Sequence, residues 1–137
     1  FNDSETLQQR FVQLYKELTV HAEAQEETVY PVVRSFYGDD NVKQRHDEQA
    51  EIKLLLYAMR ILSPTSPEFR EKLKNLRQLI TQHFHYIETT MFVAISNHFS
   101  NDQNNQLSTQ FRQAKMRLND EVEAAMQANP IGRNQIF

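Results

Sequence analysis

The chain has 137 residues, a formal net charge of −3, 2 glycines, 4 prolines and no cysteine, and this length fits one domain that buries roughly two thirds of its unfolded surface. Without cysteine, disulfides, thiolate zinc sites, iron–sulfur clusters and thiol nucleophiles are excluded, so a metal ion would need His and carboxylate ligands. The mixed charge predicts no nucleic-acid partner, and because no apolar run approaches the ~20 residues that span a bilayer, we expect no membrane contact and a cytoplasmic location.

Hydrophobic periodicity predicts an all-α protein, an up-down antiparallel four-helix bundle. The scarcity of glycine and proline supports this prediction, because it leaves few places for tight turns. We expect one domain over residues 1–129, followed by an extended tail over residues 130–137. The predicted helices cover about 4–37, 41–62, 67–99 and 103–128.

Capping residues set the predicted helix boundaries. Asp3 or Ser4 is the expected N-cap of the first helix, and Gly38 is its expected stop. The apolar stripe continues past Pro31, which should therefore kink the helix rather than end it. Pro67 directly after a serine is a strong start signal for the third helix.

The first and third helices repeat one pattern at a constant offset. His21 and His83 lie in the two apolar stripes, 62 residues apart (83 − 21). Glu26 and Glu88 follow them by five residues, at the same offset. Unrelated amphipathic helices would share the apolar period, but less often also a histidine and a glutamate in register. Neutral imidazole ligates iron, zinc or copper, and bundle cores hold metal sites on facing helices.

These residues predict a candidate metal site. Its expected ligands are His21, Glu26, His46, His83 and Glu88. The residues that share the helix face of each stripe histidine, four positions on, are Gln25 and Ile87. The glutamates are rotated by about 140° and turn inward only if a π-bulge is present. The alternative is that the two histidines are hydrogen-bonded core residues, the glutamates are surface acids and His46 is exposed.

Three segments together resemble the hemerythrin-like (HHE cation-binding) domain family over about residues 7–127. From Leu14 the chain reads Leu-Tyr-Lys-Glu-Leu-Thr-Val-His-Ala-Glu-Ala-Gln-Glu-Glu-Thr-Val-Tyr-Pro, and from His83 it reads His-Phe-His-Tyr-Ile-Glu-Thr-Thr-Met-Phe. The stretch from His46, His-Asp-Glu-Gln-Ala-Glu-Ile-Lys-Leu-Leu-Leu, is similar to the helix between them. The resemblance implies a non-haem di-iron centre, with oxygen binding, redox sensing or iron handling.

The chain departs from the family pattern at the ligand positions. The carboxylates expected four residues after each histidine are replaced by Gln25 and Ile87, and the histidine expected in the second helix is replaced by Gln49. His83 with Glu88 fits a family variant in which the carboxylate follows the histidine by five residues. Without bridging carboxylates, placing two iron ions in an apolar interior carries a large unfavourable free energy, because their charge is not offset.

Two functions therefore remain open from the sequence. The first is a metal-binding domain with iron between the candidate ligands. The second is a metal-free bundle that acts as a protein-interaction or small-ligand-binding module. No phosphate loop, nucleophile elbow or Glu-x-x-His repeat is present, which favours binding over catalysis. The family's first helix is absent, so we expect the fourth helix, a partner chain such as a homodimer partner, or residues outside this chain to cover the open face.

Overall fold

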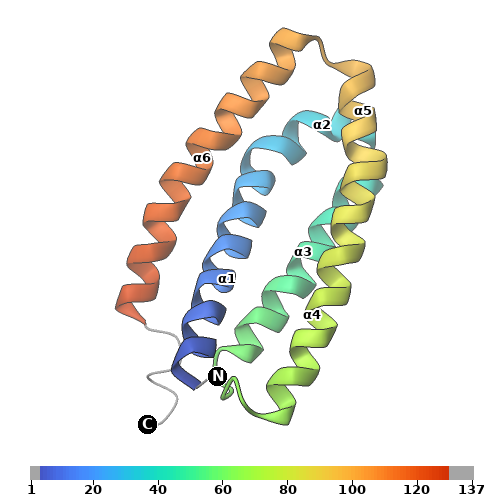
Figure 1. Ribbon diagram of the computed structural model, residues 1–137. Coiled ribbons are helices and arrows are strands. Elements are labelled where there is room, and N and C mark those ends of the chain that lie inside the picture. Colours follow the sequence, from blue (N-terminus) through green and yellow to red (C-terminus); the bar gives the residue numbers. More distant parts are fainter. Residues whose placement is uncertain (1–3, 130–137) are drawn as a thin grey trace.

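The computed structural model describes residues 4–129, and this part of the chain is almost entirely helical (Figure 1). Its elements are α1 (Ser4–Ala24), the π-helical segment η1 (Gln25–Val29), α2 (Tyr30–Tyr37), α3 (Asp39–Met59), α4 (Pro67–Tyr86), the π-helical segment η2 (Ile87–Met91), α5 (Phe92–His98) and α6 (Asn101–Ala128). Each π segment continues the helix on both sides of it, so residues 4–129 form four long helices. The predicted all-α, up-down antiparallel four-helix bundle is confirmed.

The four helices run up and down beside one another (Figure 1). Helix α1 packs against α6, and α3 packs against α4. Near the far end, α2 packs against α3 and α5, while η1 packs against α6. The fourth helix therefore covers one face of the first.

Local signals explain most of the helix boundaries. Gly38 ends the first long helix with a φ of 97°, in the left-handed region that favours glycine. Pro31 lies in the first turn of α2, where a missing backbone N–H is tolerated, and the long helix continues through it. Ser100 caps α6 through a capping box with Gln103, so this helix begins at Asn101 rather than 103. The Asp3 cap and the 130–137 tail lie outside the described residues.

The interior has apolar clusters towards both ends of the bundle and a polar layer between them. One cluster centres on Tyr30, Val33 and Met91. The other centres on Leu56, Met59 and Leu76. The buried polar residues lie between these segments, and they are Gln25, Arg45, Gln49 and His83. Within residues 4–129, no helix is both long and apolar enough to cross a membrane.

Candidate functional site

A π segment follows the stripe histidine in each of the two related helices. The segments begin at Gln25 and Ile87, again 62 residues apart (87 − 25). The wider π turn changes which side chains face the core. Gln25 and Ile87 are buried, whereas Glu26 is partly exposed and Glu88 is exposed. The bulges are thus present, but they aim the amide and the isoleucine inward and leave the glutamates outside.

The polar layer is joined by hydrogen bonds across three helices. Gln49 Nε2 donates to Gln25 Oε1 at 2.6 Å and lies 3.4 Å from His83 Nε2. His83 Nδ1 lies 2.8 Å from Glu48 Oε1. A carboxylate accepts and cannot donate, so Nδ1 carries the proton and Nε2 is the acceptor. Burial lowers the pKa of His83 below 6.5 and outweighs Glu48, which raises it, so the ring is neutral at neutral pH.

Arg45 brings a permanent positive charge into this layer. Only 2% of Arg45 is exposed, and its Nε lies 2.9 Å from Glu48 Oε1. Its two terminal nitrogens donate to Glu48 Oε2 at 3.0 Å and to the Tyr37 hydroxyl at 3.1 Å. The guanidinium also lies 4.5 Å from the Tyr86 ring centroid. The Tyr37 hydroxyl is 2.5 Å from that of Thr90, so Arg45 is tied to η2 as well.

The predicted ligands do not come together. Both carboxylate oxygens of Glu26 accept from Lys53 at 3.1 Å. His46 is exposed, with its ring 5.5 Å from that of Tyr30. His21 is partly buried and packs edge-to-face against two phenylalanine rings. Across residues 4–129, no three His, Asp or Glu side chains gather in an arrangement that holds a metal ion.

The space between the two stripe histidines is too small for two metal ions. A cavity of 20 Å³ lies there, lined in part by His21, His83 and Gln49. This volume holds about one water molecule. Gln49 Oε1 is buried and has no hydrogen-bond partner among residues 4–129, so one polar atom or ion suits the cavity. The side chains present therefore do not fit a di-iron centre.

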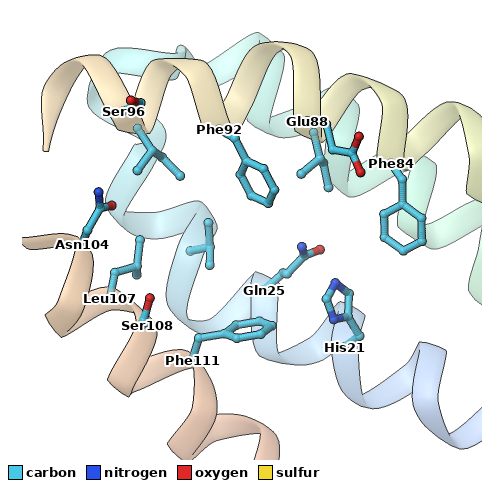
Figure 2. Close-up of a pocket in the computed structure, with 13 residues that line it drawn as sticks. His21, Gln25, Phe84, Glu88, Phe92, Ser96, Asn104, Leu107, Ser108 and Phe111 are labelled. Carbon is cyan, nitrogen blue, oxygen red and sulfur yellow. The ribbon is translucent and has the colours of Figure 1, made fainter. Parts of the chain in front are cut away.

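A much larger cavity lies beside this layer, between α6 and the α4–η2–α5 helix (Figure 2). Its volume is 530 Å³. It is lined by His21, Gln25, Val29, Phe84, Ile87, Glu88, Phe92, Ile95, Ser96, Asn104, Leu107, Ser108 and Phe111. Figure 2 shows His21 and Gln25 rising from the floor of the cavity, with Phe92 and Phe111 on opposite walls.

Two ionisable side chains, His21 and Glu88, line the large cavity. Burial, with contributions from Lys115 and His83, lowers the pKa of His21, so this ring is neutral at neutral pH. Glu88 is the other acidic or basic side chain in the lining. Lys115 lies outside the lining, with its Nζ 5.6 Å from the Phe111 ring centroid. The cavity thus joins an apolar, aromatic wall to a single carboxylate.

Sequence reasoning missed Arg45 and Glu48 as members of the polar layer. One signal was available for Arg45, because Val42, Arg45, Gln49 and Ile52 follow one another at spacings of three and four. That spacing places all four on one helix face. All four are buried, so the arginine belongs to the inner stripe.

Comparison with known proteins finds two similarities. The family described as hemerythrin HHE cation binding domain matches residues 2–95. A protein from Nostoc sp. (strain PCC 7120) named "DNA nickase" is 43% identical over 117 residues, which are 85% of this chain and 33% of that protein. The chain therefore spans about a third of the length of this relative. No solved structure matches the chain.

Proposed function

This chain belongs to the hemerythrin HHE cation-binding domain family, and from that premise we propose that it works as a metal-independent member that binds a small organic ligand. One observation carries the proposal: the buried polar layer already contains a cation, the guanidinium of Arg45. Glu48, the only carboxylate bonded to His83, neutralises that cation. No anionic group is left in this layer to balance a metal ion.

Electrostatics oppose an added metal centre. A divalent ion at the stripe histidines would lie in the same low-dielectric layer as Arg45 and would be repelled by it. The family positions that would supply bridging charge hold Gln25 and Ile87, which are neutral. Gln25 is already engaged with Gln49. A metal ion here would lack the anions that offset its charge.

The large cavity supports the ligand-binding part of the proposal. Its volume falls within the roughly 300–1,000 Å³ of typical small-molecule sites. Its walls are mostly apolar, and a few polar groups, among them His21 and Gln25, converge on it. Such a combination is typical of sites that bind organic ligands rather than bare ions. The polar layer lies directly behind the floor, so ligand contacts at Gln25 would reach Gln49 and His83.

Thermal unfolding tests metal independence. The melting temperature should be unchanged by excess Fe(II), Zn(II) or a chelator, because a ligand that binds only the folded chain must raise apparent stability. The matched control is Gln25→Glu with Gln49→His and Arg45→Met, which restores ligands and removes the competing cation. This variant should gain stability with metal. A clear metal-dependent rise in the melting temperature of the unaltered chain would overturn the proposal.

A second candidate retains one iron ion, with oxygen binding, redox sensing or iron handling as its role. It is favoured by the small cavity between His21 and His83 and by the free oxygen of Gln49. His83 also donates Nδ1–H to a carboxylate, as metal-ligating histidines do. Anaerobic Fe(II) titration, with His83→Gln as control, separates the candidates. Saturation at one ion per chain, lost in His83→Gln, would favour the iron site.

The similarity to a protein named DNA nickase raises the question of whether this chain contacts DNA. We propose that this chain is a ligand-responsive domain that does not itself contact DNA or a membrane, since acidic residues outnumber basic ones by 18 to 15. Fluorescence anisotropy with labelled duplex DNA should show no binding at physiological salt. Saturable binding would assign a DNA-contacting role to this chain. The homodimer or partner chain expected on an open face stays a prediction, which light scattering tests.

A further inference from the structure

The lining of the large cavity contains one charged side chain, the carboxylate of Glu88. We propose that the ligand is a small organic ammonium ion with an apolar, preferably aromatic, body. The inference rests on the proposed function, because it names the ligand class of the same cavity. Two features carry it: an unpaired carboxylate in the lining, and aromatic side chains beside that carboxylate.

Glu88 is free to receive a cation. Its side chain is exposed, and no hydrogen bond or ion pair engages it within residues 4–129. Its counterpart in the related helix, Glu26, is held by Lys53. The two glutamates occupy the same position in the repeated pattern, so the difference is in their partners. Only the glutamate beside the large cavity is left without a counter-charge.

Aromatic rings flank the same end of the cavity. Figure 2 shows Glu88 between Phe84 and Phe92, with Phe111 on the opposite wall. Ring faces attract a cation within about 6 Å of the centroid, and this attraction is stronger where the cation is shielded from water. Phe92 is 52% exposed, so a ligand body that covered it would bury apolar surface. Rings and carboxylate together favour an ammonium group on an apolar frame.

The neighbouring groups leave the ammonium only one favourable place. Lys115 lies against the Phe111 ring and outside the lining, so it disfavours a cation near Phe111 and directs the charge towards Glu88. An anionic ligand would instead face an uncompensated carboxylate, and a neutral ligand would not use it.

The opposite end of the cavity is polar but uncharged. Figure 2 shows Ser96, Asn104 and Ser108 together at that end, on α5 and α6. Their hydroxyl and amide groups can donate or accept hydrogen bonds. The ligand therefore carries its ammonium at the Glu88 end and tolerates a neutral hydrogen-bonding group at its other end.

A matched set of probes tests the ligand class. Phenylbutylammonium, phenylbutanol and phenylbutyrate share a phenyl ring on a four-carbon chain and differ in the terminal group, which is positive, neutral and negative respectively. Each is titrated into the isotopically labelled chain and followed by NMR. Two unit charges about 4 Å apart and fully exposed to water attract each other by about 1 kcal/mol, which is about fivefold in affinity, and like charges repel by as much. The ammonium should therefore bind at least tenfold more tightly than the carboxylate.

Two variants and one control make the outcome decisive. Glu88→Gln should lower ammonium affinity about fivefold, to the level of the alcohol. Glu71→Gln, an exposed glutamate on α4 outside the cavity, should leave the affinity unchanged. Ser108→Trp, at an exposed position in the lining, should abolish binding by filling the cavity.

The possible failures are distinguishable. If all three probes bind equally and Glu88→Gln changes nothing, the ammonium class is overturned while ligand binding in this cavity stands. If none of the probes shifts the resonances of cavity residues, the proposed function itself fails. Binding that persists in Ser108→Trp would place the probe elsewhere and overturn the inference.

Discussion

Replacing Arg45 by methionine should lower the free energy of unfolding by about 3 kcal/mol, because breaking a buried ion pair leaves its partner uncompensated at a cost of roughly 3–5 kcal/mol. The guanidinium lies within ion-pair distance of both oxygens of Glu48 and donates a hydrogen bond to the Tyr37 hydroxyl. The side chain of Glu48 is 16% exposed and also accepts from His83, so some solvation remains and the low end of the range applies.

Urea unfolding followed by circular dichroism measures this loss. The double variant Arg45→Met with Glu48→Gln should recover at least half of it, because no isolated charge remains and His83 keeps an acceptor. Lys43→Met, on the same helix and paired with Asp47 at the surface, should change stability by less than about 0.5 kcal/mol. An Arg45→Met loss below about 1 kcal/mol, or no recovery in the double variant, would refute a buried, paired cation in the polar layer.

Three further predictions concern the same framework. The pKa of His83 is lowered in the folded chain, so the unfolded chain binds the proton more readily, and the same holds for His21. Stability should therefore be complete above about pH 6.5 and fall as the pH drops below it. In a stability profile measured by urea unfolding, His83→Gln should make this fall shallower and leave the part that comes from His21. Gln25→Leu should cost about 1–3 kcal/mol, because it removes the closer acceptor, Gln25 Oε1, of the buried Gln49 amide, while Gln13→Leu at the exposed surface should cost little in the same assay. Gly38→Ala should cost about 1 kcal/mol from its left-handed backbone alone, since the added Cβ would lie 3.7 Å from Asn41 Nδ2, and a larger loss of thermal stability would point to a steric clash.

The helices could be predicted because apolar residues repeat along them at helical spacing. The relation between the first and third long helices was also visible, since His21 and His83 share a register and the structure adds matching π segments. Capping signals at Gly38 and Pro67 agree with the observed boundaries. These features depend on local sequence, which is why a single sequence is sufficient to predict them.

The interior of the site could not be predicted in the same way. Arginine is a surface residue by its polarity, and Arg45 is buried only because Glu48, Tyr37 and the Tyr86 ring surround it. The inward direction of Gln25 depends on the π turn, which the sequence could suggest but not orient. The large cavity depends on how far α6 lies from the α4–η2–α5 helix, a distance set by packing rather than by periodicity.

Metal analysis of the purified chain tests metal independence most directly. The protein should be produced in cells supplied with excess iron, purified without chelator and measured for iron and zinc by mass spectrometry. We expect metal far below one ion per chain, both in the unaltered protein and in His83→Gln. One or two irons per chain, lost in His83→Gln, would contradict it and return the chain to the metal-binding function of its family.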